Sequence, residues 1–301
     1  MELFCGFILV LITGLFWIGI GIAVSRCSAK GWNYSIVSGL TYLGASLICA
    51  MILAGKRIHS GASGFSGFGF FMSGLAGVAH FYSYLLTAKA MQRGPNGLVW
   101  SIMQSGMLGT FLMGMLFFGE KPAVSQLSGM FLLLSGILVM GMTKVETSSV
   151  HGKNWMLLSL GALLLTMTTQ CCNTLPSYFH TMEGNSHLSR TLGLYLGGAL
   201  AFAFTTLPGM LRRRDFGGRG EWATASLLAV LYPSASLFFF YRGLDLLSQN
   251  GCAGLGYPIA IGVCVIGFSL YSLLLLKEKV TRLGMAGLGA VGIGMILIAL
   301  K

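Results

Sequence analysis

Long apolar stretches separated by short polar connections run through the whole 301-residue chain. A helix needs about 20 apolar residues to cross the hydrocarbon of a bilayer, and these stretches have about that length. They are continuously apolar, whereas strands of a membrane barrel alternate polar and apolar positions. The pattern predicts transmembrane helices near residues 3–24, 34–54, 67–88, 96–118, 124–143, 155–175, 188–211, 222–241, 253–276 and 280–300.

Composition agrees with a protein that resides in a bilayer. Hydrophobic residues make up 55% of the chain and charged residues only 9%, and the mean hydropathy is +0.79. Such a chain cannot cover a water-soluble domain with polar side chains. We therefore expect an all-α integral membrane protein that crosses the membrane many times, in the bacterial inner (plasma) membrane.

A sequence repeat relates the two halves. The segment GEKPAVSQLSGMFLLLSGILVM, from Gly119, returns as KEKVTRLGMAGLGAVGIGMILI, from Lys277, so that Glu120 falls on Glu278 at an offset of 158 residues. Five helices are an odd number, so the second copy enters the membrane inverted. We predict ten transmembrane helices as two inverted five-helix repeats, residues 1–148 and 149–301, around a site near the midplane.

The repeated segments also resemble a known family. The stretch LLTAKAMQRGPNGLVWSIMQSGMLGTFLMGMLFFGEK, the glycine-rich helix after it, and the second copy ending PIAIGVCVIGFSLYSLLLLKEK are similar to the EamA-like branch of the drug/metabolite transporter superfamily. The resemblance implies ten helices, a central cavity between the halves, and transport of small metabolites without ATP. Its signature turns are Gly119, Glu120, Lys121, Glu278 and Lys279, and Lys277 replaces the leading glycine of the second turn.

The repeated acids Glu120 and Glu278 follow apolar helices directly and stand beside lysines. We interpret them as interfacial ion pairs or as caps on the following helix, not as ligands. All acidic residues fall at the ends of predicted helices or in loops. Small multidrug relatives of the superfamily exchange protons and cationic drugs at a membrane-embedded carboxylate, so a neutral, zwitterionic or anionic solute is favoured here.

Polar groups within the predicted helices are the candidates for a substrate site, because burying them in hydrocarbon is costly unless they are paired or line a wet cavity. His80 lies near the middle of a predicted helix, and it is either a proton relay or ligand or a neutral side chain bonded to a neighbouring helix. Trp100 and Tyr257 have interfacial anchoring as the alternative. The substrate-binding candidates are Trp17, His80, Tyr84, Trp100, Gln104, Gln170, Asn173, Tyr232 and Tyr257.

Two prolines fall inside predicted helices. Pro233 and Pro258 each remove a backbone donor, so we expect kinks and consider both as hinge candidates. The alternative is that membrane helices simply tolerate proline.

The sequence indicates a secondary transporter that moves a small polar metabolite by alternating access, with a coupling proton or ion as a candidate partner. The alternatives are a sugar or lipid-linked or nucleotide-sugar translocator of the same fold, or a membrane protein that does not transport. No HExxH, GxSxG or P-loop motif occurs, so no enzyme is predicted, and neither a cofactor nor a metal. The net charge of +11 is scattered over the loops, which disfavours nucleic acid as a partner.

Orientation and assembly stay open at this stage. Basic residues are more numerous in the loops that would be cytoplasmic if both termini were outside, and this favours that orientation. Members of the family usually have both ends in the cytosol. The glycine-rich last helix of each repeat could pack within one chain or mediate a homodimer.

Overall fold

The computed structural model of the chain describes residues 2–60, 65–91, 93, 96–143, 154–179, 187–275 and 281–300. Within these residues every regular element is a helix, and no strand occurs. The α-helices are α1 (Glu2–Lys30), α2 (Tyr34–Ser60), α3 (Gly67–Met91), α4 (Asn96–Gln104), α5 (Met107–Phe117), α6 (Val124–Thr143), α7 (Trp155–Thr174), α8 (His187–Thr205), α9 (Leu207–Arg213), α10 (Arg219–Ser234), α11 (Tyr241–Gln249), α12 (Gly256–Leu274) and α13 (Arg282–Ala299). Short 3-10 segments η1 (Leu175–Tyr178) and η3 (Ala253–Leu255) and the π-helix η2 (Ala235–Phe240) join some of them.

Each of the ten predicted stretches is mainly helical in its described part. Two of them are interrupted: residues 96–118 divide into α4 and α5, and residues 188–211 divide into α8 and α9. Six helical segments are long and apolar enough to cross a membrane, and α8 with α9 makes a seventh if this pair, bent by 44°, is one broken span. The chain is thus an all-helical protein with several candidate membrane spans, and the count of ten stays a prediction. The predicted boundary between the repeats, at residue 148, lies outside the described residues.

The long helices break at identifiable positions. The segment from α10 to α11 contains Pro233 and changes to a π-helix two residues later, as expected where a proline removes a backbone donor. At Pro258 we expected a kink inside a helix, but the structure does not place this residue in a helix interior. Pro258 lies in the first turn of α12, where its missing N–H would have had no intrahelical partner, so it breaks no helix interior.

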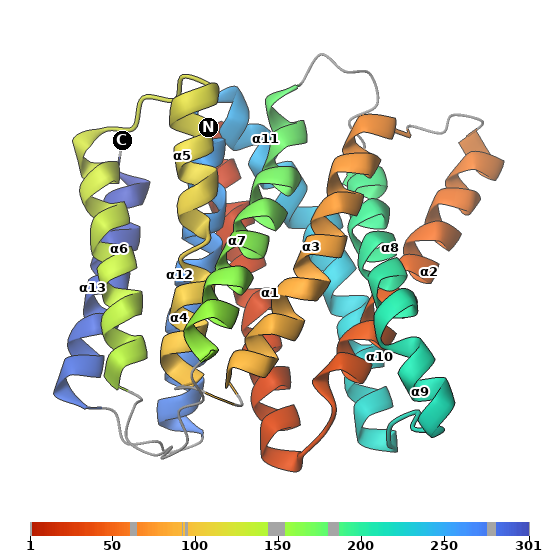
Figure 1. Cartoon of the computed structure of the whole chain (residues 1–301). Helices are drawn as coiled ribbons and strands as arrows, with labels where there is room; N and C mark the ends of the chain where they lie inside the picture. The colour runs from red at the N-terminus through yellow and green to blue at the C-terminus, as the bar shows by residue number, and fades with distance from the viewer. Residues whose placement is uncertain are drawn as a thin grey trace.

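Helices from the two halves of the chain pack against each other throughout the bundle. Helix α1 packs along α12, α2 contacts both α8 and α10, and α3 contacts α7 and α8. Helix α1 begins and α13 ends at the same end of the bundle, the upper end in Figure 1. Segments far apart in the sequence therefore surround the centre of the molecule together.

Helices α6 and α13 lie side by side at one edge of the bundle (Figure 1). An added Cβ at Gly129 would lie 2.6 Å from the backbone oxygen of Gly294, and one at Gly136 would lie 2.7 Å from that of Gly287. From Gly129 to Gly136 the residue number rises along α6, whereas the contacted residue on α13 changes from Gly294 to Gly287. The two helices are therefore antiparallel. The absence of side chains lets the backbones touch, which is the usual role of small residues between membrane helices.

We predict that Gly136→Leu destabilises the protein by about 1–3 kcal/mol, because the new side chain must enter a filled space. The matched control is Gly289→Leu on α13, where an added Cβ meets nothing within 4 Å. Thermal unfolding of the purified variants in detergent compares the two. Equal melting temperatures for both variants would contradict the close α6–α13 contact.

Candidate functional site

A cavity lies at the centre of the bundle, and all nine substrate-binding candidates named from the sequence line it. Residues from α1, α2, α3, α4, α7, α8, α10, η2, α11 and α12 contribute to its wall. The wall therefore includes helices from both halves of the chain. These candidates are Trp17, His80, Tyr84, Trp100, Gln104, Gln170, Asn173, Tyr232 and Tyr257.

Several residues of the wall escaped the sequence reasoning. Tyr34, Ser38, Thr41 and Tyr42 line the cavity along α2. The last three follow Tyr34 by four, seven and eight residues, which places all four on one helix face. That spacing was the signal in the sequence. Tyr195 and Tyr241 also belong to the wall. Thr191 precedes Tyr195 by four residues and Asp245 follows Tyr241 by four, so helical spacing of polar residues was a signal here as well.

His80 contacts two tyrosines in the cavity wall. Its Nδ1 is hydrogen-bonded to the hydroxyl of Tyr42, and its ring lies edge-on to Tyr84 with 4.8 Å between the centroids. Both sequence-based interpretations of His80 therefore have a structural counterpart: it bonds a neighbouring helix, and it also faces the cavity.

Aromatic rings form two clusters in the wall. In one cluster, Tyr84 packs against Tyr34 at 5.9 Å and Trp100 at 6.4 Å between centroids. In the other, Trp17, Phe240 and Tyr257 lie 4.9–5.7 Å apart. Tyr257 is only 5% exposed, so it is not an interfacial anchor.

Helix α7 presents a polar face to the cavity. Both polar atoms of the Asn173 side chain are bonded, since its Nδ2 donates to the Tyr257 hydroxyl (3.1 Å) and its Oδ1 accepts from the Tyr241 hydroxyl (3.2 Å). Gln170, nearly one turn earlier, is 4% exposed, and its buried Oε1 has no partner. The two amides thus differ: Asn173 fixes two rings, and Gln170 keeps an acceptor available.

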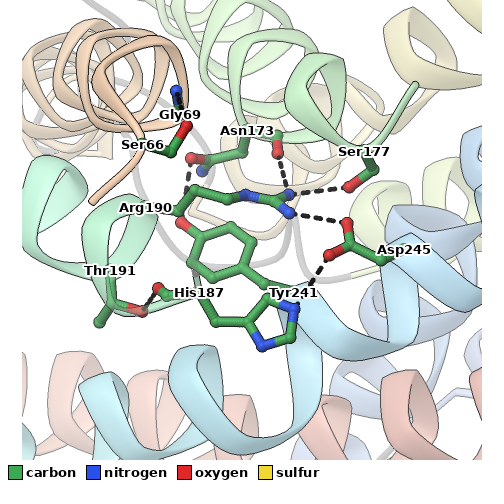
Figure 2. A network of polar contacts seen from close by, with 9 residues as sticks. All are labelled: Ser66, Gly69, Asn173, Ser177, His187, Arg190, Thr191, Tyr241 and Asp245. Atoms are coloured by element: carbon green, nitrogen blue, oxygen red, sulfur yellow. Dashed lines mark hydrogen bonds and ion pairs between the residues drawn. The ribbon is translucent and has the colours of Figure 1, made fainter. Parts of the chain in front are cut away.

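Behind this wall lies an ion pair, shown in Figure 2. Arg190 of α8 is 0% exposed, and its Nη1 lies 2.7 Å from Oδ1 of Asp245, whose side chain is 17% exposed. Its Nη2 donates to the backbone oxygen of Asn173 (2.8 Å) and to Oγ of Ser177 (2.9 Å). Nε2 of His187 lies 2.9 Å from the other carboxylate oxygen of Asp245.

The ion pair is connected to the cavity through shared residues. The guanidinium lies 4.1 Å from the centre of the Tyr241 ring, and Tyr241 and Asn173 both line the cavity. This cluster was not predicted, because Arg190 was interpreted as one of the loop charges and Asp245 as one of the acids at helix ends. An arginine inside the apolar stretch 188–211 was the overlooked signal.

Glu120 joins the two halves of the chain at the upper end of the bundle. Its carboxylate accepts from the Tyr178 hydroxyl (3.0 Å) and from the backbone N–H of Gly254 (3.2 and 3.3 Å). Burial raises the pKa of Glu120 above 4.5, and the two hydrogen bonds oppose this shift. Glu120 is thus a link to η1 and η3, which differs from the expected ion pair or helix cap.

The turn before Glu120 is tight. Gly119 has φ of +66°, a left-handed conformation that glycine adopts without strain, and Lys121 follows on the exposed surface. Glu278 and Lys279 lie outside the described residues. Among the residues that the structure does describe, no group of three His, Cys, Asp or Glu side chains is placed to hold a metal ion.

Residues 4–142 match the model of the EamA-like transporter family, which is part of the drug/metabolite transporter superfamily. A solved crystal structure of another protein is similar in fold, with a TM-score of 0.67 over 97% of this chain and 95% of that chain, at 12% sequence identity. No match was found among curated proteins.

We predict that Asp245→Asn destabilises the protein by about 3–5 kcal/mol, because it leaves the buried guanidinium of Arg190 without a counter-charge. The exposed Asp215 provides the control variant Asp215→Asn, for which less than about 0.5 kcal/mol is expected. The double variant Arg190→Met with Asp245→Asn should regain part of the loss. Chemical unfolding in detergent measures all three, and a double variant less stable than Asp245→Asn would contradict the pairing.

A pH dependence follows from the raised pKa of Glu120. The folded state holds the proton more tightly than the unfolded state, so this carboxyl stabilises the fold below pH 4.5 and the contribution is lost as pH rises through the raised pKa. The melting temperature of Glu120→Gln should therefore rise relative to that of the wild type as pH rises above 4.5, because glutamine does not ionise. A constant difference over that range would contradict the shift.

Proposed function

We propose that this protein is a secondary transporter, which moves a small polar metabolite across the membrane by alternating access between two inverted five-helix repeats. The observation that carries the proposal is the central cavity, whose polar and aromatic wall is built by both halves of the chain. A transporter of this kind has its site at the interface of the repeats. The match of residues 4–142 to the EamA-like transporter family supports the transport class.

The packing of the helices supports the inverted repeat. At the offset of 158 residues, Gly129 corresponds to Gly287 and Gly136 to Gly294. The contacts join Gly129 to Gly294 and Gly136 to Gly287. If each glycine is replaced by its counterpart in the other half, the first contact becomes the second. A pseudo-two-fold axis requires this behaviour.

Other helix pairs behave in the same way. By the same offset, α1 corresponds to α7 and α12 to α4 and α5, and both α1 with α12 and α7 with α4 and α5 are in contact. Likewise α3 corresponds to α10 and α11, and α8 to α2, and both α3 with α8 and α10 with α2 are in contact. These correspondences favour two repeats that can rock around the cavity.

In this proposal the ion pair of Arg190 and Asp245 closes one end of the transport pathway. It joins α8 to α11 above the wall residues Asn173 and Tyr241. At the offset of 158, Arg190 corresponds to Trp32 and Asp245 to Thr87, so the opposite end has no equivalent ion pair. The two ends are therefore closed by different contacts, and opening the upper end requires this pair to separate or to become hydrated.

A sugar translocator is the second candidate, because aromatic rings with hydroxyls and amides also suit a sugar. The described residues of the wall include no lysine or arginine, which argues against the anionic phosphates of a nucleotide-sugar or of a lipid-linked sugar. A coupling proton or ion, a homodimer and a bacterial inner membrane location belong to the proposal as well, with the orientation of the termini open.

The test is transport by reconstituted vesicles. Proteoliposomes loaded with a mixture of small polar metabolites should release some of them faster than vesicles without protein, as measured by mass spectrometry of the medium. Cys264→Phe, which adds a ring to the cavity wall, should reduce this release to the background. Leu270→Phe on the exposed side of the same helix is the control. Release that is equal with and without protein would refute the transport function.

A further inference from the structure

We infer that the cavity binds a small uncharged solute with a flat unsaturated ring that carries both an N–H donor and a carbonyl acceptor. This inference rests on the proposed transport function and goes beyond it by naming a substrate class. Three independent properties of the wall lead to it: its charge, its rings and its unpartnered polar atoms.

The charge of the wall favours a solute without net charge. None of the described residues that line the cavity is Asp, Glu, Lys or Arg. The nearby charges of Arg190 and Asp245 neutralise each other at 2.7 Å. A solute with a net charge would lose its hydration and find no counter-charge in the wall, which is unfavourable in a site of low dielectric.

The rings favour a flat solute. The first aromatic cluster contains Tyr34, Tyr84 and Trp100, and the second contains Trp17, Phe240 and Tyr257. They come from six different elements, α2, α3, α4, α1, η2 and α12. An unsaturated ring gains offset-stacked or edge-to-face contacts with such side chains that a puckered ring cannot make.

The unpartnered polar atoms define the hydrogen bonds. Two residues of the wall, Gln170 and Tyr232, have buried oxygens without a partner. In this inference the Oε1 of Gln170 accepts a hydrogen bond from an N–H of the solute, and the Tyr232 hydroxyl donates one to a carbonyl. Asn173 is not available for this role because both ends of its amide are bonded to Tyr257 and Tyr241. Leaving a buried acceptor unsatisfied is unfavourable, so the solute completes the wall.

The test uses uracil as the probe, because it is flat, uncharged, and carries N–H and C=O groups. Radiolabelled uracil should bind saturably to the full-length protein in lipid nanodiscs. Three unlabelled competitors separate the arguments: orotate adds a carboxylate to the same ring, dihydrouracil keeps the polar groups but loses the flat ring, and choline is a cation. Each should compete at least about tenfold more weakly than uracil. A competitor that matches uracil overturns the corresponding part of the inference.

Variants then test the assigned hydrogen bond. Gln170→Met keeps a similar shape without the acceptor and should weaken uracil binding about tenfold. Thr168→Ala, on the exposed face of the same helix, is the matched control and should leave binding unchanged. Unaltered melting temperatures without probe establish that both variants fold. Equal uracil affinity in the wild type and Gln170→Met would remove Gln170 from the site.

The failures of the two proposals are distinguishable. If uracil does not bind, but the vesicles release another solute, the substrate class is wrong and transport stands. If uracil binds saturably, but neither uracil nor any metabolite crosses the membrane, the transport function is wrong and the ring-binding site stands.

Discussion

The structure depends on one constraint: a polar group in the interior of an apolar bundle needs a partner from the protein itself. The two terminal nitrogens of Arg190 illustrate it, whereas its buried Nε has no partner among the described residues. Its guanidinium is fully buried, and the chain surrounds it with a carboxylate, a backbone oxygen, a serine hydroxyl and the face of Tyr241. These partners come from α7, η1 and α11, and Arg190 itself belongs to α8. The demands of one buried charge thus fix the relative positions of four elements around one end of the cavity.

The same constraint distinguishes structural polar residues from available ones. Asn173 bonds Tyr257 and Tyr241, while Thr169 donates to the backbone oxygens of Leu165 and Ala76. These groups are satisfied inside the protein and hold helices and rings in place. Gln170 lies between them on α7 and keeps a buried oxygen without a partner. In a membrane protein, such an exception has a cost unless a ligand removes it.

The sequence predicted much of the fold because apolar length and glycine spacing are properties of continuous segments. The limits of α6, residues 124–143, agree with the prediction, and the repeated glycines pack α6 on α13. The wall of the cavity was also partly predictable, because an amide or a histidine within an apolar stretch must either bond a neighbouring helix or face a polar cavity. His80 and Gln170 were found in this way.

Contacts between distant segments were beyond the reach of the sequence. Nothing along the chain indicates that Asp245 meets Arg190, because the pairing depends on how α8 and α11 cross. Position relative to the predicted helices misled in two cases. Pro258 was expected to interrupt a helix, but α12 begins only two residues before it. Glu120 was interpreted as an interfacial ion pair or a cap on the following helix, but it bonds Tyr178 and Gly254.

The arrangement of α7 gives a physical route by which a solute could influence the closed end. Gln170 faces the cavity and lies less than one turn from Asn173, whose backbone oxygen accepts from Arg190. A solute can shift the equilibrium between two conformations only if it binds one of them more tightly. A rigid α7 meets this condition, because a displacement that brings Gln170 toward the solute also moves Asn173 relative to Arg190. The free energy gained from one hydrogen bond between the solute and Gln170 then opposes the free energy lost with one hydrogen bond of the ion-pair cluster. These two free energies are of comparable size.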